Sequence, residues 1–351
     1  MIVLASNYLN DNPVEWLLNN SEPSIKFHTR REILGEQTGN AEYSAILESP
    51  AIRRLITNNG TLLGNTDNYD LFYKGSIWCF SEAVERGLDI RTPFIHNTAE
   101  FIISKCQTSS GGFALNWNPR VELACRTGDM IRYLIRAGYR DERISRGIDW
   151  IVKNQRVDGG WLHCPLAGIC DQLKLVLLKK PGNGLRREMD PNVTSCFFAT
   201  IACAMALVEF SQTSGSVLYN ESIEKAVEFF LKRSLFKNTR NEPIVARSSW
   251  NRDFRLLGYP VLSQYDVLYG LLFVARAGHL NDRRTGEAFN LIMSKQNNDG
   301  TWNMENVQTG MIKEDIVKSP AGTKSKWVTL QVLRLLKYAV TSGSHLCSTV
   351  P

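Results

Sequence analysis

The chain has 351 residues, 43% of them hydrophobic, and its 41 Lys and Arg against 35 Asp and Glu give a formal net charge of +6. This length exceeds that of an ordinary single domain, so two domains or one repetitive domain are expected. The charges are interspersed, which argues against a nucleic-acid partner. No uninterrupted apolar run reaches the roughly 18 residues of a membrane span, and Met1–Asn10 lacks the pattern of a signal peptide. Eight cysteines are too few for a disulfide scaffold, so we expect a soluble cytoplasmic protein.

The predicted elements are all helices. The first is a buried helix at Pro23–Leu34, followed by an outer neighbour at Ala41–Thr57. Beyond them, nearly apolar helices, expected to be buried on most sides, alternate with charged amphipathic helices, expected to be half-exposed. The apolar group is Tyr73–Val84, Leu123–Ala137, Ser195–Phe210, Gln264–Ala277 and Lys326–Tyr338. The amphipathic group is Arg143–Asn154, Glu221–Arg233 and Arg284–Lys295. No useful alternation of Val, Ile and Thr competes with this all-helical prediction.

Three segments repeat one pattern: Phe101–Phe113, Ile148–Trp161 and Phe289–Trp302. Each contains the end of an amphipathic helix, then Gln, a polar turn, Gly and an aromatic residue. Glycine ends the helix in a backbone conformation that other residues resist, and the aromatic side chain returns to pack on the helix that it has left. The Gln amide can bond backbone groups freed at the turn.

Alternating buried and half-exposed helices predict two concentric layers, and about six hairpins come close to a closed ring. The predicted fold class is therefore all-α, an α/α toroid, with one domain over residues 1–342 and a tail over 343–351. The long loops at Leu162–Asn192 and Phe236–Ser263 are expected on one functional face.

The segments Gln155–Trp161 and Gln296–Trp302 resemble the QW repeats of squalene and oxidosqualene cyclases and the related repeats of protein prenyltransferases. The whole chain is similar to bacterial and archaeal proteins described only as prenyltransferase-like or squalene-cyclase-like, and this resemblance implies the toroid. The sequence lacks the Asp-x-Asp-Asp and Asp-Cys-Thr-Ala-Glu acid motifs of the cyclases and the Asp-Asp-x-x-Asp motif that binds magnesium diphosphate. Ordinary polycyclisation and diphosphate ionisation are therefore not favoured.

Cysteines and one histidine are expected to gather at one rim of the ring. Cys125 and Cys196 begin successive buried helices, His163 and Cys164 follow the turn between them, and Cys170 lies in the adjoining loop. Thiolates at helix N-termini are stabilised by the helix dipole, and such a set could hold tetrahedral zinc. The arrangement is similar in kind to the catalytic zinc site of protein prenyltransferases, although their Asp-x-Cys pair has no equivalent here.

The alternative is that these cysteines only fill the core, because their spacings follow the hairpin period and no compact metal motif is present. Cys106 and Cys203, in the middle of apolar helices, are expected to be packing residues and nothing more.

Asp129, one turn after Cys125, and Asp266, at the start of a buried helix, are the candidate catalytic acids. An acid facing an apolar cavity would have a raised pKa and could donate a proton, whereas the alternative for Asp266 is a helix cap. His28 and His279 are interpreted as surface or capping histidines. Four aromatic residues near buried-helix starts could line a cavity, or simply fill the core: Trp78, Phe197, Tyr265 and Trp327.

The leading functional hypothesis is an enzyme that binds an isoprenoid or similar lipid-like molecule in a central apolar cavity, with zinc at the rim. One alternative is a noncatalytic toroid that binds a lipid or a protein. Another is a carbohydrate-active α/α toroid with paired carboxylates. The expected ligand is a small apolar molecule, with no nucleic acid and no transmembrane segment involved.

Overall fold

The structure is a computed structural model that describes residues 6–116, 120–162, 194–245, 253–262, 264–306 and 320–341. Contacts divide the chain into two compact units, which we call unit 1 (Met1–Arg53 with Phe230–Pro351) and unit 2 (Arg54–Phe229). The described residues are mostly helical, as predicted. Their named strands are β1 (Ile56–Thr57) and β2 (Leu62–Leu63), an antiparallel pair in unit 2.

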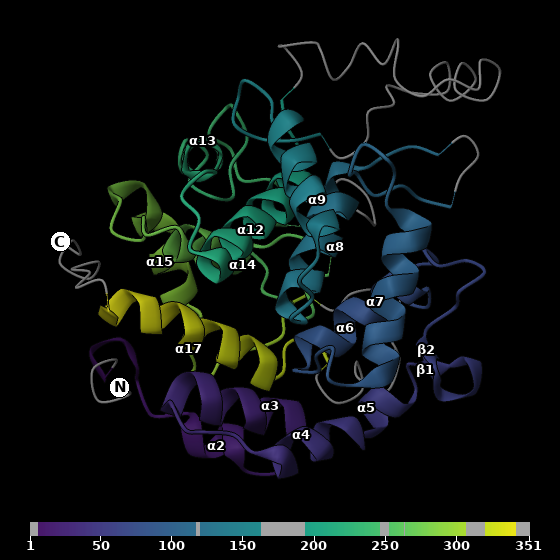
Figure 1. Ribbon diagram of the computed structural model, residues 1–351. Helices are drawn as coiled ribbons and strands as arrows, with labels where there is room; N and C mark the ends of the chain where they lie inside the picture. The colour runs from purple at the N-terminus through teal and green to yellow at the C-terminus, as the bar shows by residue number, and fades with distance from the viewer. Residues whose placement is uncertain are drawn as a thin grey trace. The chain divides into compact units, whose positions relative to one another are not determined.

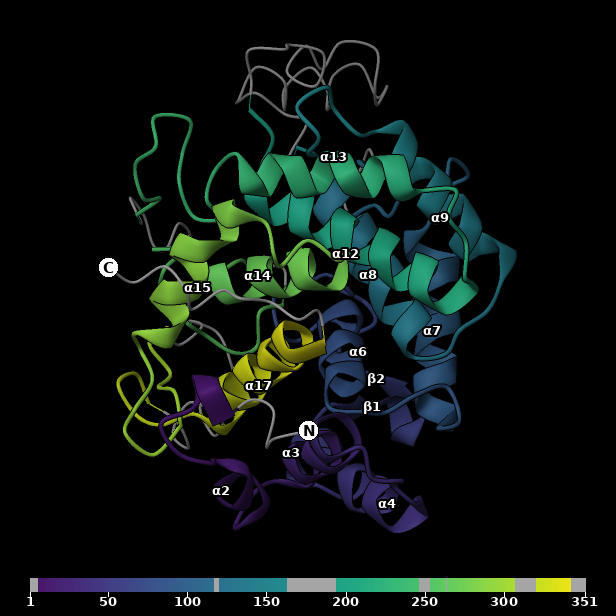
Figure 2. The same ribbon diagram turned by 90° about the vertical axis from the view of Figure 1, so that its left-hand side faces the viewer.

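Unit 2 is built around a close contact between two buried helices, α8 (Ala124–Arg136) and α12 (Phe197–Ser214) (Figure 2). A Cβ atom on Gly128 of α8 would lie 2.4 Å from the backbone of Ala202 in α12, so glycine is what allows the two backbones to approach. Unit 2 also contains α6 (Ser76–Glu85), α7 (Pro93–Cys106), α9 (Glu142–Lys153) and most of α13 (Asn220–Leu231).

Unit 1 contains both the N-terminal and the C-terminal part of the described chain. Its helices are α2 (Val14–Leu18), α3 (Pro23–His28), η2 (Thr29–Leu34), α4 (Asn40–Leu47), α5 (Pro50–Arg53), α14 (Val267–Arg276), α15 (Gly286–Met293) and α17 (Lys326–Thr341), with short 3-10 turns at Ser6–Tyr8 and Arg283–Thr285. The last helix, α17, packs against α14 on one side and against α3 and η2 on the other, and Figure 1 shows it in yellow between these groups.

One predicted helix is wrong in its extent. The segment predicted as a single helix over Ala41–Thr57 is interrupted after α4, and Pro50 begins the separate α5. Proline lacks an N–H and its ring clashes with the preceding turn, so it starts a helix better than it continues one. The chain then enters the β1–β2 hairpin.

Burial follows the predicted alternation of helices. Every residue from Val267 to Ala275 in α14 is buried, whereas α9 buries only one face. The apolar helix α12 is long enough, by length and composition, to cross a membrane, but 61% of it is buried inside the protein. Its close contact with α8 accounts for that apolarity, because a helix packed on several sides needs no polar face.

In the repeated turns, the Gln side chain hydrogen-bonds backbone carbonyl groups, as the sequence predicts. Gln155 Nε2 donates to the carbonyl oxygens of Gly159 at 2.9 Å and of Ser222, at the start of α13, at 2.8 Å. Gln107 makes the same two kinds of bond, with Gly111 and with Arg143 of α9. Each of these turns is thereby fastened to the start of the next amphipathic helix.

The third turn bonds to the N-terminal segment instead. Gln296 Oε1 accepts from the backbone N–H of Asn10 at 3.0 Å, and its Nε2 donates to the Tyr8 carbonyl oxygen at 3.4 Å. A Cβ atom on Gly300 would lie 1.9 Å from the Asp11 carbonyl oxygen. Residues 8–11 therefore occupy the place that the next amphipathic helix takes at the other turns.

The tryptophan of the second and of the third repeat fastens the turn to two helices. The indole N–H of Trp161 donates to the Ile151 carbonyl oxygen at 2.7 Å, and that of Trp302 to Ile292 at 2.8 Å, which confirms the predicted packing on the helix just left. Their backbone N–H groups donate to threonine hydroxyls on the following buried helix. These pairs are Trp161 with Thr200, Trp302 with Thr329 and, in the first repeat, Phe113 with Thr127.

A fourth turn of the same kind follows α13 and was not predicted. The N–H of Asn238 donates to the Glu242 carbonyl oxygen, as the corresponding residues do in the other three turns. Lys237 takes the place of Gln, and its Nζ lies 2.6 Å from Glu287 at the start of α15. Asn241 takes the place of Gly with a left-handed φ of 62°. Asparagine is one of the few residues that tolerate this conformation, so the repeat persists without its sequence signature.

Candidate functional site

Asp266 lies at the N-terminus of α14 and caps it. Its Oδ1 accepts from the backbone N–H of Tyr269 at 2.8 Å, and its Oδ2 accepts from that of Gly258 at 3.1 Å. The side chain is buried. Asp266 is therefore a helix cap, which the sequence analysis gave as the alternative. A capping carboxylate can still be protonated, so this role is compatible with that of an acid.

The pKa of Asp266 is raised to about 6. Burial is the main cause, the two backbone N–H bonds act in the opposite direction, and the nearby Glu305 carboxylate raises the pKa further. Burial disfavours the charged form of a carboxyl group, whereas N–H donors stabilise it. Asp266 is thus a buried acid that takes up a proton close to neutral pH.

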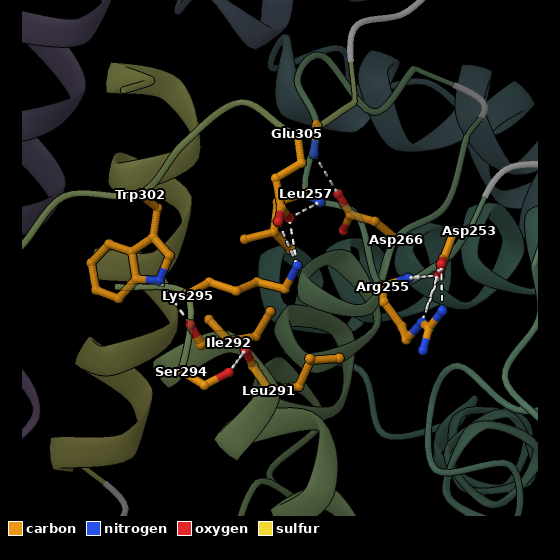
Figure 3. A network of polar contacts seen from close by, with 11 residues as sticks. Asp253, Arg255, Leu257, Asp266, Leu291, Ile292, Ser294, Lys295, Trp302 and Glu305 are labelled. Atoms are coloured by element: carbon orange, nitrogen blue, oxygen red, sulfur yellow. Dashed lines mark hydrogen bonds and ion pairs between the residues drawn. The ribbon is translucent and has the colours of Figure 1, made fainter. Parts of the chain in front are cut away.

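A polar network holds the backbone beside Asp266 in place (Figure 3). Glu305 Oε2 accepts from the N–H of Leu257 at 2.9 Å, and Lys295 Nζ lies 2.6 Å from Glu305 Oε1. Arg255 and Asp253 form an ion pair at 2.6 Å within the same segment. Because Leu257 precedes Gly258, these contacts fix the N–H that donates to Asp266.

Tyr265 packs as a core residue. Its ring stacks on Phe230 at a centroid distance of 5.5 Å, and its hydroxyl donates to the Leu235 carbonyl oxygen at 2.6 Å. A Cβ atom on Gly270 would lie 2.1 Å from that hydroxyl. Gly270 stands where the other buried helices carry Thr127, Thr200 or Thr329, so the tyrosine hydroxyl fills the space of the missing threonine.

Trp327 is the more exposed of the two predicted cavity aromatics in unit 1. It is half-buried near the start of α17, and its ring stacks on Tyr259 at 4.1 Å with an interplanar angle of 7°. Tyr259 directly follows Gly258, the donor to Asp266. The same Trp327 ring lies 6.0 Å from the ring of His28, which is buried and not at the surface as predicted. The rings of Tyr259, Trp327 and His28 therefore follow one another, and Asp266 is connected to them only through the backbone of Gly258.

Trp78 and Phe197, in unit 2, are buried against other aromatic rings. Trp78 packs on Phe72 at 4.3 Å, and the Arg126 guanidinium lies 4.2 Å from its ring. Phe197, the first residue of α12, meets Phe229 edge-on at 5.4 Å. These contacts give both residues core packing, and a role in lining a cavity stays a prediction.

Cys125 is buried near the start of α8, and its neighbour is Cys203. The Cys203 thiol donates to the Ala124 carbonyl oxygen at 3.2 Å, and the charge states of the two cysteines and Asp129 influence one another. Burial raises the pKa of Cys125 to about 11; Arg126 opposes this effect and Asp129 adds to it. The expected thiolate at the helix N-terminus is therefore a neutral thiol, because desolvation outweighs the helix dipole.

Cys196 does not stand in the position equivalent to Cys125. It is the N-cap of α12, and its N–H donates to the Trp161 carbonyl oxygen, as the N–H of Leu123 does to Phe113 at the start of α8. Cys125 lies two residues further along its helix. The two cysteines therefore lie at different distances from the N-terminus of their helices. The sequence signal that could have identified Cys203 as the neighbour of Cys125 is Gly128, the small residue at which α8 and α12 approach each other.

Among the residues described here, no three His, Cys, Asp or Glu side chains are grouped so that they could hold a metal ion. His163, Cys164 and Cys170 lie outside the described residues. Cys125 and Cys196, the two predicted ligands that the structure describes, are too few on their own for a zinc site, which takes at least three protein ligands. The zinc site stays a prediction.

No protein-family model and no curated protein matches this sequence. Among solved structures, the chain is similar to the type II terpene cyclase MstE from Scytonema. A variant of that enzyme in complex with its product, merosterolic acid A, gives 13% identity, a TM-score of 0.46 and coverage of 97% of this chain and 96% of that chain. The apo enzyme gives 13% identity and a TM-score of 0.44, with 87% and 84% covered.

Proposed function

We propose that this protein is an enzyme that protonates an apolar, isoprenoid or similarly lipid-like substrate, with Asp266 as the proton donor. The observation that carries the proposal is a buried carboxyl group at a buried-helix start whose pKa is raised to about 6. A general acid works best when its pKa lies near the working pH. A minor fraction of Asp266 is therefore protonated near neutrality, and a larger one at slightly acidic pH.

The surroundings of Asp266 suit a cationic intermediate. Protonation of an alkene carbon uses the π electron pair to form a C–H bond and leaves a carbocation. Aromatic ring faces attract cations, and the Tyr259–Trp327 pair is joined to Asp266 through Gly258. Oδ2 makes the longer of the two bonds to backbone N–H groups, so we assign the transferable proton to that oxygen.

The closed α/α toroid is part of the proposal. It is supported by the way in which successive turns are fastened to the next amphipathic helix, with residues 8–11 as the partner of the third turn. A ring of this kind would place the N-termini of its buried helices around a central apolar cavity.

Deuterium incorporation tests the proposed reaction. Wild-type protein would be incubated in D2O with squalene and with geranylgeranyl diphosphate, and the extracted lipids analysed by mass spectrometry. We expect one carbon-bound deuterium per product molecule, because the proton that Asp266 donates comes from solvent. Asp266→Asn should lower incorporation by about 100-fold, within the usual contribution of a general acid.

Asp282→Asn is the matched control, because Asp282 is also an N-cap carboxylate of unit 1 but its side chain is 26% exposed. It should retain full incorporation. Equal loss in both variants, or no incorporation by the wild type, would contradict the proposal.

The second candidate is a noncatalytic toroid that binds a lipid-like molecule. One observation favours it: both Asp266 oxygens already accept backbone hydrogen bonds. Lipid that copurifies with the protein and is recovered unchanged would support this function. A carbohydrate-active enzyme is less favoured, because the carboxylate that influences Asp266, Glu305, is already ion-paired with Lys295.

A further inference from the structure

Two carboxylates accept hydrogen bonds from successive N–H groups of one short segment. Glu305 Oε2 accepts from the N–H of Leu257 at 2.9 Å, and Asp266 Oδ2 accepts from that of Gly258 at 3.1 Å (Figure 3). Asp266 caps α14, whereas Glu305 follows the third repeated turn. The hydrogen bond to Oδ2 of the acid therefore depends on what holds Leu257 in place.

The backbone of residues 305–306 fixes the peptide unit that donates to Asp266. The N–H groups of Glu305 and Asn306 both donate to the Leu257 carbonyl oxygen at 2.9 Å. That oxygen and the Gly258 N–H belong to one planar peptide unit, so bonds to the oxygen also set the direction of the N–H. A Cβ atom on Gly258 would lie 2.7 Å from the Asn306 carbonyl oxygen, so the fit between the two segments requires glycine.

Lys295 holds the side chain of Glu305. Its Nζ lies 2.6 Å from Oε1 and 2.7 Å from Oε2, and the two side chains are 18% and 26% exposed. Lys295 directly precedes the third repeated turn and Glu305 follows it, so this ion pair joins the two ends of the turn. The turn thereby holds the carboxylate that binds Leu257.

The two members of the ion pair act on Asp266 in opposite directions. The Glu305 carboxylate disfavours a second negative charge at Asp266, and it contributes to the raised pKa of about 6. The Lys295 ammonium group, which contacts both Glu305 oxygens, opposes that effect. Removal of one charge should therefore have the opposite effect on Asp266 to removal of the other.

The other ionisable groups of this region leave that balance intact. The neighbouring Tyr265 hydroxyl is neutral, because burial and, secondly, the charge of Asp266 raise its pKa well above the usual range. Asp253 and Arg255, on the segment that contains Gly258, form an ion pair with each other at 2.6 Å. Neither group offers Asp266 an unopposed charge.

We infer that Glu305, held by Lys295, is a positioning residue for the proposed acid, because it fixes the Leu257–Gly258 peptide whose N–H meets Asp266 Oδ2. This inference rests on the proposed function and adds a control of the proton that Asp266 donates. The balance of charge between Lys295 and Glu305 sets how readily that proton is released. Neither residue contacts the substrate in this role.

NMR titration tests the charge effect without any substrate. The Asp266 carboxyl carbon would be followed in protein labelled with 13C-aspartate, and its signal identified by its absence in Asp266→Asn. Glu305→Gln keeps an oxygen for the Leu257 N–H but removes the charge, so it should lower the pKa of Asp266 by about 0.5. Lys295→Met leaves the charge of Glu305 unopposed and should raise that pKa by about 0.5.

Glu287→Gln is the matched control, because Glu287 forms an ion pair of the same length, 2.6 Å, with Lys237 elsewhere in unit 1. It should leave the pKa of Asp266 unchanged, as should Lys295→Arg, which keeps the positive charge. Each variant must first show the helical circular dichroism of the wild type, and if Lys295→Met does not fold, Glu305→Gln alone decides. Shifts of the same sign in Glu305→Gln and Lys295→Met, or no shift in Glu305→Gln, would overturn the inference.

Deuterium incorporation at about pH 5 tests the positioning, with the same two lipid probes. Asp266 is then mostly protonated, so the charge effect is small. Glu305→Ala also removes the acceptor of the Leu257 N–H and should lower incorporation by about 10-fold, because a misplaced catalytic group loses rate. Glu305→Gln should retain most of it. Full incorporation by a folded Glu305→Ala would overturn this inference and leave the proposed function standing, whereas no incorporation by the wild type would overturn both.

Discussion

Asp266 should make stability depend on pH in an unusual direction. Its folded pKa of about 6 exceeds the usual 3.8, so between these values the folded state binds more protons than the unfolded state. Its contribution to the free energy of unfolding therefore falls as pH rises from about 4 to about 6. The difference between these two pKa values corresponds to about 3 kcal/mol. Urea denaturation at about pH 4 and about pH 7 should show that Asp266→Asn loses this dependence.

Asp282→Asn supplies the opposite sign when the urea denaturation is extended below about pH 4. Hydrogen bonds from Arg284 lower the pKa of Asp282, so its contribution is present above the usual carboxyl pKa and is lost as pH falls through the lower, folded value. If the two variants change the pH dependence in the same direction, the assignment of a raised pKa to Asp266 is wrong.

Cys125 and Cys203 should be unreactive in the folded protein. Burial raises the pKa of Cys125 to about 11 and that of Cys203 further above its usual value, and the thiolate is the reactive form. Iodoacetamide at about pH 8 should leave both unmodified until urea unfolds the chain. If the purified wild-type protein contains zinc and Cys125→Ala does not, the predicted zinc site at the rim would be supported instead.

At the scale of elements, glycine is required for two separate reasons: a left-handed backbone conformation and the close approach of another segment. Gly159 has a φ of +89°, and a Cβ atom there would lie 2.1 Å from the Lys225 carbonyl oxygen. Gly215, which ends α12, has a φ of +69° with open space around it. Gly215→Ala should therefore cost only the left-handed conformation, roughly 1–2 kcal/mol.

Gly159→Ala should cost more, about 3 kcal/mol or above, because the turn must also move away from α13. Thermal unfolding of the two variants measures the difference. Equal losses would show that the close approach to Lys225 contributes nothing.

A second repeat signal lies at the starts of the amphipathic helices. The motif Asp-x-Arg occurs before these helices at Asp89, Asp141 and Asp282, and also at Asp253 in a loop, and each aspartate accepts from the backbone N–H of the arginine two residues later. Together with the glycine that ends the preceding helix, this motif marks the hairpin junctions. It would have located the start of α7, which the Gln and aromatic pattern leaves undefined.

At the scale of the molecule, the N-terminal segment should be essential to unit 1. Residues 8–11 bond to the third turn, and the side chain of Lys326 in α17 bonds to Asn19 and Ser21. Deleting residues 1–12 should lower the thermal midpoint of unfolding by exposing the turn around Gly300. Gln296→Ala, which removes only the amide contacts, should lower it less. A midpoint unchanged by the deletion would show that these contacts do not stabilise unit 1.

The proposed toroid should also be compact. A single globular particle of this length has a radius of gyration of about 20 Å, and small-angle X-ray scattering measures it directly. A markedly larger value would contradict the proposed ring.

The sequence by itself determined the helices, their alternation of buried and half-exposed faces, and three of the turns, because these depend on local periodicity and on residues with special backbone preferences. It also marked Asp266 as a buried-helix start. Tertiary structure decided the neighbours: Cys203 beside Cys125, Glu305 beside Leu257, and residues 8–11 beside the third turn. Such pairs join residues far apart in the chain, and their identity depends on how closely two backbones approach. Burial, which sets the pKa values of Asp266 and Cys125, arises only once those neighbours have excluded water.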